Sequence, residues 1–353
     1  MKHPIAPRRA VLRLDAYHGI QEDRAGKLRL DFNENTVGCA PVALRAVARM
    51  TRAQVAMYPE YTKTRAMLAR NYGVRPDELL LTNGADDALR LVFDTFVDRG
   101  NIILLAEPTF NMYRFWAALA GARAVTLRYD AEMRFPLAEA LRALKRRPRA
   151  LFLANPNNPT GTVVERGALR RLLGAAPHTL LVVDEAYSEF CAVGVLPWIR
   201  RFPNLVVVRT LSKAAGLAGL RLGLVFTNRD TARAMRTAQA PFAVNTAALV
   251  AAAASAADRS FIKRYVVEVK KSKRHLEGAL LRLGVKAFPS GGNFLLADFG
   301  ARGPKMVAAL RRRGILLRDR THDFGRPGLV RITIGTRPQM RRLVRALNRE
   351  LRG

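Results

Sequence analysis

The chain alternates between short apolar runs and amphipathic segments from about residue 80 onward. The apolar runs show no apolar–polar alternation, which is typical of strands buried on both faces of a mainly parallel sheet. Seven strands are predicted: Leu79–Leu81, Ile102–Leu105, Ala124–Leu127, Ala150–Leu153, Leu180–Val183, Leu205–Val208 and Leu222–Phe226. Helices are predicted between them, for instance Ala85–Val97, Leu137–Arg146 and Arg166–Leu173. This alternation predicts an α/β domain in which helices cover both faces of the sheet.

The pattern changes after about Thr227, where long helical stretches dominate. Helical stretches are predicted over Asp230–Ala238, Asn245–Leu283, Pro304–Arg313 and Arg337–Leu351, and strands over Phe294–Ala297, Ile315–Leu317 and Val330–Ile334. These elements predict a smaller α+β domain. We therefore expect an N-terminal arm (1–30) that packs on the small domain or a partner subunit, a large domain (31–235) and a small domain (236–353).

The composition is typical of a cytoplasmic enzyme. The chain shows no signal-peptide pattern, and no apolar run reaches the roughly 18 residues of a transmembrane helix. Cys39 and Cys191 are the only cysteines, so the sequence predicts neither a disulfide framework nor a cysteine-based metal site. No metal is expected, and no membrane partner.

The net charge of +32 has two interpretations. A basic surface attracts the phosphates of nucleic acids, whereas arginines spread over solvated helix faces need no partner. Clusters occur at Lys145–Arg149, Lys270–Arg274 and Arg311–Arg313, at predicted helix ends or polar faces and without interleaved aromatic residues. This favours the second interpretation, so a nucleic-acid partner is not expected. A basic protein still attracts anionic metabolites.

The most specific stretch runs from Thr210 to Gly223 and reads TLSKAAGLAGLRLG. It follows a predicted buried strand. Lys213, among small residues, can form an imine with an aldehyde cofactor, and Thr210, Ser212 and Arg221 can bind a phosphate dianion. A serine-capped surface lysine would explain the Ser-Lys pair alone, but not the glycines and the arginine that follow it.

Asp184 follows the predicted strand Leu180–Val183. The carboxyl ends of strands are where α/β sheets bind ligands. A carboxylate beside a pyridine nitrogen keeps that nitrogen protonated, which makes the ring an electron sink. Tyr187, nearby in the sequence, could hydrogen-bond a ring oxygen. Taken alone, these residues also fit an ordinary acidic turn.

Two more polar segments follow predicted strands. Asn155–Gly161 reads NPNNPTG, a rigid turn that can hold one amide against a ligand oxygen. A plain structural turn explains four of these residues better than all seven. Thr82–Asp87 reads TNGADD and opens a predicted helix. A helix N-terminus binds anions, although an Asn-Gly turn with an Asp cap is also common.

In order and spacing, these four motifs resemble those of the fold-type I, class I/II aminotransferases, and within that family the chain looks most like the histidinol-phosphate aminotransferases. The resemblance extends from about Leu30 to the C-terminus and includes the stretches Asn33–Asn35, Tyr58–Pro59, Pro108–Phe110, Pro241–Asn245, Gly292–Phe294 and Arg331–Gly335. It implies a large domain that binds pyridoxal 5′-phosphate (PLP), a small domain, and a homodimer with active sites at the subunit interface.

The resemblance also implies roles for single residues. Lys213 would bind PLP as a Schiff base and transfer the substrate's proton. Asp184 would pair with the pyridine nitrogen, Tyr187 and Asn158 would contact the 3′ oxygen, and Phe110 would stack on the ring. The phosphate would be bound by Ala85, Asp86, Thr210, Ser212, Arg221 and, from the neighbouring subunit, Tyr58. Substrate would be bound by Arg331, Arg318, Tyr17 and Asn35.

Several positions depart from the usual pattern of the family that the chain resembles. Thr36 stands where proline is usual, and Ala85 where serine is frequent. Phe110 replaces a common tyrosine and loses its hydroxyl. Ala215 and Ala243 are smaller than the usual residues. Since Ala243 is expected near the substrate, these departures bear on substrate identity more than on chemistry.

The resemblance implies a ping-pong transaminase of histidine biosynthesis. L-Glutamate would donate its amino group, and imidazole-acetol phosphate would accept it to give L-histidinol phosphate. Three alternatives remain: an aromatic amino-acid transaminase, a PLP decarboxylase acting on threonine phosphate, and a non-catalytic nucleic-acid-binding protein. Ser212 and the stretch Arg331–Gly335 favour the transaminase over the decarboxylase, and the intact set around Lys213 opposes the last alternative.

Overall fold

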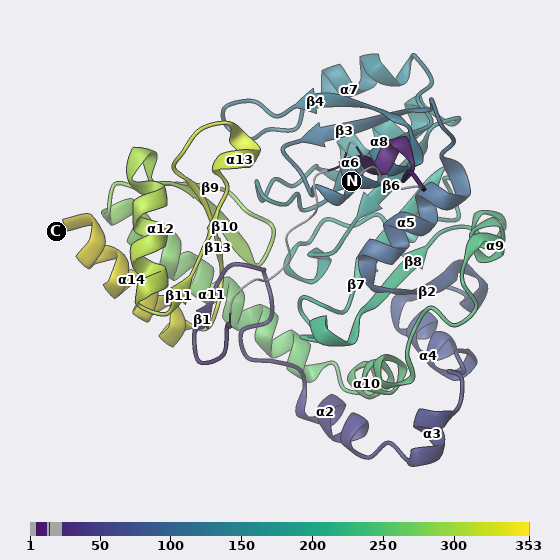
Figure 1. Ribbon diagram of the computed structural model, residues 1–353, viewed down its shortest axis with the longest axis horizontal. Coiled ribbons are helices and arrows are strands. Elements are labelled where there is room, and N and C mark those ends of the chain that lie inside the picture. Colours follow the sequence, from purple (N-terminus) through teal and green to yellow (C-terminus); the bar gives the residue numbers. More distant parts are fainter. Residues whose placement is uncertain (1–4, 13, 15–22, 353) are drawn as a thin grey trace.

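The computed structural model describes residues 5–12, 14 and 23–352. Its centre is a seven-stranded sheet in the order β2-β8-β7-β6-β5-β3-β4 (Figure 1). The strands are β2 (Leu79–Asn83), β3 (Ile102–Glu107), β4 (Arg123–Arg128), β5 (Ala150–Ala154), β6 (Leu180–Asp184), β7 (Leu205–Thr210) and β8 (Leu222–Phe226). Within this sheet β8 is antiparallel to both neighbours, and the other pairs are parallel. The predicted α/β class and the mainly parallel seven-stranded sheet are confirmed.

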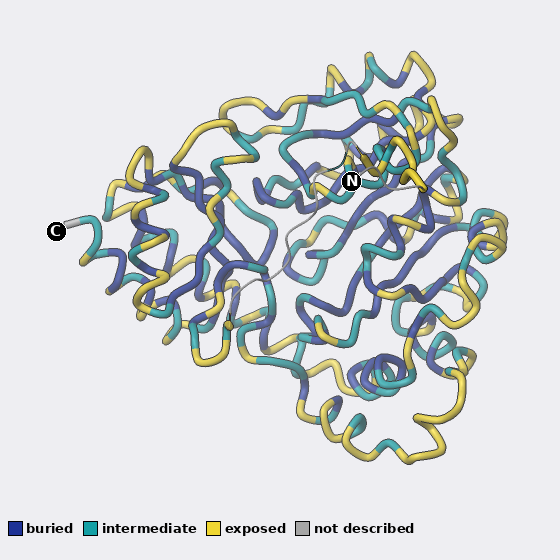
Figure 2. Tube along the Cα trace, in the orientation of Figure 1, coloured by how far each residue is buried: buried dark blue, intermediate teal, exposed yellow. Residues whose placement is uncertain are grey.

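Helices cover both faces of this sheet because side chains alternate between two apolar clusters. Leu79 and Leu81 belong to one cluster and Leu80 to the other. The first face is covered by α2 (Pro41–Ala48), α4 (Thr62–Tyr72), α7 (Leu137–Leu144), α8 (Arg166–Ala175) and α10 (Thr246–Ala257). The second is covered by α5 (Gly84–Phe96), α6 (Met112–Ala120) and α9 (Arg229–Ala238). Figure 2 shows the buried sheet inside a more exposed outer layer.

The C-terminal part is the predicted α+β unit. Its antiparallel sheet has the order β12-β13-β10-β9. The strands are β9 (Lys286–Phe288), β10 (Phe294–Asp298), β12 (Arg318–Asp319) and β13 (Leu329–Thr333), and the helices are α11 (Ser260–Arg282), α12 (Gly303–Arg312), α13 (Thr321–Phe324) and α14 (Arg337–Arg352). A strand from the N-terminal part of the chain, β1 (Leu28–Arg29), pairs in parallel with β11 (Ile315–Leu316) of this unit.

The remaining elements are short. They are α1 (Arg9–Leu12), α3 (Arg52–Ala56) and the 3-10 helices η1 (Pro76–Glu78), η2 (Ser188–Phe190), η3 (Leu196–Trp198), η4 (Ala218–Leu220) and η5 (Gly300–Arg302). None of the helices among the described residues is both long and apolar enough to cross a membrane.

The predicted helical stretch Asn245–Leu283 is in fact two helices. Asp258 has an extended backbone (φ −125°, ψ 96°) that ends α10, its carboxylate accepts the Ser260 N–H at 2.8 Å, and α11 begins at Ser260. Helix α10 packs on α2 and α4, in the cluster of the large sheet. We therefore propose that the small domain starts near Ser260 and not at residue 236, as the sequence had suggested.

Candidate active site

A cavity of about 430 Å³ lies at the carboxyl ends of the parallel strands, with its walls drawn from both sheets. Twelve of the predicted site residues line it: Ala85, Asp86, Phe110, Asn158, Asp184, Tyr187, Thr210, Ser212, Lys213, Arg221, Arg318 and Arg331. Parallel strands bring the turns at their carboxyl ends to one edge of the sheet, so motifs far apart in the sequence meet there.

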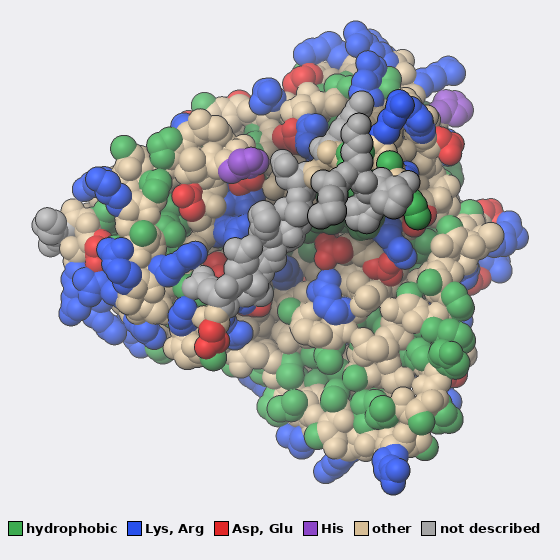
Figure 3. All heavy atoms as spheres, viewed as in Figure 1, with side chains coloured by type: hydrophobic (Ala, Val, Ile, Leu, Met, Phe, Trp, Pro, Cys, Tyr) green, Lys and Arg blue, Asp and Glu red, His purple; other side chains and the backbone are tan. Residues whose placement is uncertain are grey.

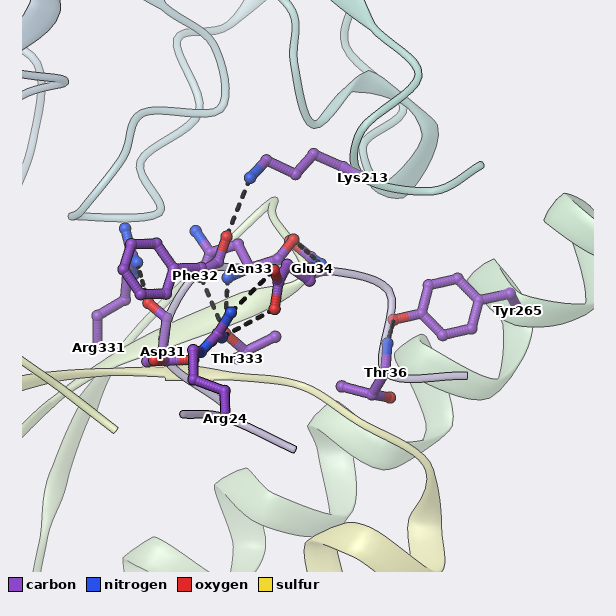
Figure 4. Close-up of polar contacts among 11 residues, drawn as sticks. Arg24, Asp31, Phe32, Asn33, Glu34, Thr36, Lys213, Tyr265, Arg331 and Thr333 are labelled. Atoms are coloured by element: carbon purple, nitrogen blue, oxygen red, sulfur yellow. Dashed lines mark hydrogen bonds and ion pairs between the residues drawn. The ribbon is translucent and has the colours of Figure 1, made fainter. Parts of the chain in front are cut away.

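Lys213 follows β7, and its Nζ donates to the backbone carbonyl of Phe32 at 3.0 Å (Figure 4). Asn35 lies behind this segment. Its Nδ2 donates to the Ala214 carbonyl at 3.0 Å, and its Oδ1 accepts the Val37 N–H at 2.9 Å. Asn35 is not among the residues that line the cavity, and both ends of its amide bind backbone, whereas the sequence had placed it in contact with substrate. It holds the chain beside Lys213.

Asn33 fixes the wall of the cavity opposite Lys213. It has a left-handed backbone (φ 56°), which is uncommon outside glycine. Its N–H donates to Thr333 Oγ1 at 3.0 Å, and its carbonyl accepts from Asn293 Nδ2 at 3.1 Å. The side-chain Nδ2 donates to the Tyr187 hydroxyl at 3.0 Å. The hydrogen of that hydroxyl is therefore left to donate into the cavity.

Asp184 ends β6 and is 6% exposed. The Tyr113 hydroxyl donates to its Oδ2 at 2.7 Å, and the Ala186 N–H donates to its Oδ1 at 3.0 Å. Burial raises the pKa of this carboxyl to about 6, against the effect of both hydrogen bonds. A positive charge entering the cavity would favour the ionised carboxylate. Sequence analysis did not identify Tyr113, because it lies within the ordinary amphipathic helix α6.

One end of the cavity is suited to a phosphate. Helix α5 begins at Gly84, so Ala85 and Asp86 lie in its first turn, where backbone N–H groups carry partial positive charge. Arg221 Nη2 lies 3.0 Å from Asp86 Oδ2. A Cβ at Gly84 would come within 2.4 Å of the same Nη2, so only glycine lets the guanidinium approach the helix start. Hydroxyls of Thr210 and Ser212, 2.9 Å apart, complete this end.

A second anion site is centred on Arg331 in β13. This guanidinium is buried, and it donates to Asn158 Oδ1 and to the Asp31 carbonyl, while its Nε has no hydrogen-bond partner. Burial, followed by the charge of Arg320, lowers its pKa to about 10. No carboxylate among the described residues forms an ion pair with it, so an anionic ligand would supply the missing charge.

Two further arginines lie near Arg331. The Arg318 guanidinium lies over the Phe32 ring at 5.3 Å, and Arg320 forms an ion pair with Asp323. Arg320 lines the cavity but was not predicted. In extended backbone, residues two apart face the same side. The spacing of Arg318 and Arg320 could therefore have indicated that Arg320 also faces the cavity.

The other predicted residues have different surroundings. Phe110 lines the cavity, with its ring 5.8 Å from that of Tyr113. Tyr58 is 79% exposed, lies outside the cavity and stacks on Phe242 at 4.4 Å. Tyr17 lies outside the described residues. The N–H of Thr36 donates to the Tyr265 hydroxyl at 3.4 Å, a bond that the proline usual at this position could not make.

Comparison with known proteins agrees with this geometry. The model of the family "Aminotransferase class I and II" matches residues 25–347. The chain therefore belongs to the class I and II aminotransferases.

Similar proteins narrow the class further. A histidinol-phosphate aminotransferase from Symbiobacterium thermophilum is 38% identical over 92% of this chain and 90% of its own length. The structure of the histidinol-phosphate aminotransferase from Sinorhizobium meliloti, in complex with pyridoxal-5′-phosphate, has a TM-score of 0.84 at 27% identity, covering 92% and 91% of the two chains. The structure of L-threonine-O-3-phosphate decarboxylase from Porphyromonas gingivalis has a TM-score of 0.81 at 26% identity, covering 92% of this chain and 100% of that one.

Proposed function

We propose that this chain is the PLP-dependent transaminase that exchanges an amino group between L-glutamate and imidazole-acetol phosphate, giving 2-oxoglutarate and L-histidinol phosphate. The observation that carries the proposal is one cavity with two anion sites, around Arg221 and around Arg331, together with Lys213 and Asp184. One anion site suits the phosphate of a cofactor. The other suits the anionic group of a substrate, so a single pocket can serve both halves of the reaction.

The donor set fits PLP. Arg221, Thr210, Ser212 and the start of α5 would hold the phosphate, and the buried carboxylate of Asp184 would hold the pyridine nitrogen. When bound, PLP supplies an aldehyde that condenses with amines and a ring that withdraws electrons from the reacting carbon. Phe110 would pack against that ring.

The residues of the chain then perform distinct tasks. Lys213 Nζ would hold the cofactor in the resting enzyme and would move the proton that leaves the substrate Cα. When PLP is bound, the Tyr187 hydroxyl and Asn158 Nδ2 would donate to the ring oxygen, and Asp184 would keep its negative charge beside the pyridine nitrogen. The segment around Asn33 forms the wall of the cavity opposite Lys213.

Substrate choice depends on the arginines. Glutamate has an α-carboxylate, whereas histidinol phosphate has none and carries a phosphate ester. Arg331 can bind either group through paired hydrogen bonds. Arg318, in the same cavity, adds a second guanidinium, which favours a dianion over a monoanion.

Replacing Arg318 tests this assignment. We expect Arg318→Ala to lower kcat/KM for L-histidinol phosphate more than for L-glutamate, by roughly 1.5–3 kcal/mol in activation free energy, as for a hydrogen bond to a charged group. Steady-state kinetics of both half-reactions measure the difference. Arg326→Ala is the matched control, since Arg326 is exposed, pairs with Asp298 and does not line the cavity. Equal losses in both half-reactions would contradict the assignment and favour the aromatic transaminase.

We also propose that the enzyme acts as a cytoplasmic homodimer. Large apolar side chains are exposed around α2 and α3, where Figure 3 shows hydrophobic atoms gathered. They include Leu44 (65% exposed), Val55 (70%), Met57 (61%), Tyr58 (79%) and Phe242 (51%). An apolar surface of this kind marks a protein contact.

The cytoplasmic location rests on the cysteines. Cys39 and Cys191 are both free thiols, as is usual in a reducing compartment. Cell fractionation would test this location.

The dimer gives Tyr58 its predicted place near the partner's phosphate site. We expect a dimer in sedimentation velocity and weaker PLP binding in Tyr58→Phe, because the hydroxyl would bind the phosphate. Tyr61→Phe is the control: its hydroxyl instead binds the Val244 backbone of its own chain. A fully active monomer would refute the proposal.

A further inference from the structure

The last helix, α14 (Arg337–Arg352), carries a row of arginines on one face. Arg337, Arg341, Arg345 and Arg349 are all exposed. Residues four apart lie on the same side of a helix, about 6 Å apart along its axis. The row is therefore about 18 Å long. The row does not stabilise the helix, because like charges at this spacing destabilise it.

A groove beside this row concentrates the charge. It has a volume of about 190 Å³ and is lined by Arg313, Arg342, Arg345 and Arg349, together with Ile315 and Ala346. Arg313 pairs with Glu350 at 2.7 Å. Among the described residues, no ion pair with an acid is found for the other three arginines. Figure 3 shows basic side chains gathered at this end of the molecule, over α12 and α14.

This surface is separate from the catalytic cavity. None of its arginines lines that cavity, so binding PLP or a small substrate gives them no role. The apolar side of α14, with Met340, Leu343 and Leu347 fully buried, packs into the small-domain core. The helix thus presents its arginine row to solvent. Arg337 pairs with Glu268, whereas no acid among the described residues forms an ion pair with Arg341, Arg345 or Arg349, so these three are available to bind an anionic partner.

We propose that the arginine face of α14 and the adjoining groove bind the phosphate backbone of double-stranded DNA without regard to sequence. Guanidinium groups bind phosphates through paired hydrogen bonds. Each strand of duplex DNA carries one charge per about 3.4 Å of axis, so a row about 18 Å long spans about five phosphates of one strand. The net charge of +32 draws the duplex in from a distance.

The same features disfavour other anionic partners. Helix α14 contains no aromatic residue on which single-stranded bases could stack. A row of arginines gives contacts to backbone phosphates, which carry no sequence information. An interfacial membrane helix inserts an apolar face, and the apolar face of α14 is buried.

Fluorescence anisotropy of a labelled duplex of mixed sequence, titrated with the PLP-loaded protein, tests the proposal. We expect a dissociation constant of about 10⁻⁴–10⁻⁶ M that weakens steeply between about 50 and 200 mM salt. The variant R341Q/R345Q/R349Q should bind at least about tenfold more weakly, with a salt slope shallower by about 2.7, since each lost phosphate contact removes about 0.9. Glutamine is a good helix former, so the fold is retained.

The matched control is R142Q/R170Q/R171Q. It removes the same number of exposed arginines from α7 and α8, at sites with no ion pair among the described residues. We expect it to bind within about twofold of the unaltered protein, allowing for the small effect of net charge. Equal losses in both variants would overturn the proposal in favour of diffuse attraction. No binding at about 50 mM salt, or tighter binding of single-stranded DNA, polyglutamate or anionic vesicles, would also overturn it.

Discussion

The Lys213→Arg variant is expected to lose amino transfer by about 10⁴-fold or more, the upper end of what a positioned acid–base group contributes. Arginine keeps the positive charge and is slightly longer than lysine. Its guanidinium stays protonated, however, so it can neither attack an aldehyde nor exchange a proton with the substrate. The variant therefore separates the chemistry of Lys213 from its charge.

Colour and mass give the direct readout. The purified protein loaded with PLP should be yellow, and borohydride should fix the cofactor to the peptide that contains Lys213. Lys271→Arg, on the exposed side of α11, makes the same change without loss of either property. A colourless protein that takes up no PLP, or a Lys213→Arg variant with ordinary turnover, would contradict the role of Lys213.

The Asp184→Asn variant is expected to keep some cofactor yet lose kcat by at least about 10²–10³-fold, as when one preorganised charge-stabilising group is removed. The substitution nearly preserves shape, so the loss would come from the missing negative charge beside the pyridine nitrogen. Single-turnover kinetics measure it. Near-normal kcat would rule out this role for Asp184.

Although Asp184→Asn should lower kcat, it should raise the free energy of unfolding of the protein without cofactor. Burial raises the Asp184 pKa from 3.8 to about 6, so between these values the folded state binds more protons than the unfolded state. The free energy of unfolding therefore falls as pH rises through that window. Above about pH 6, Asp184→Asn should be more stable by up to about 3 kcal/mol, at 1.36 kcal/mol per pKa unit. Urea unfolding on both sides of the window tests this, and an unchanged pH dependence would contradict it.

The sequence predicted the large sheet because its strands are apolar on both faces. Strands such as β6 and β7 form uninterrupted apolar runs that no amphipathic helix would show. Short strands such as β1, β9 and β12 span two or three residues and carry no pattern of their own. The break between α10 and α11 was missed because only a few residues form it: Asp258, whose backbone is extended, ends α10, and α11 begins two residues later at Ser260.

Which residues line the cavity could be predicted where reactive or charged residues stand close together in the sequence. Lys213 and Arg221 belong to one such stretch, and sheet topology brings the motifs together. Contacts made through tertiary structure were not predictable. Tyr113 reaches Asp184 across 71 positions in the sequence, and Phe32 contributes a backbone carbonyl, which any residue could supply. Asn35 was assigned to the substrate, although its amide binds backbone on both sides.

Initial rates of amino transfer from L-histidinol phosphate to 2-oxoglutarate, measured over a grid of both concentrations, test the central claim most directly. Because both substrates must use one cavity in turn, the double-reciprocal plots should be parallel, as for a ping-pong reaction. The value of kcat/KM should be higher for L-histidinol phosphate than for phenylalanine or tyrosine. Intersecting lines, a better rate with the aromatic amino acids, or release of carbon dioxide from threonine phosphate without amino transfer would contradict the account.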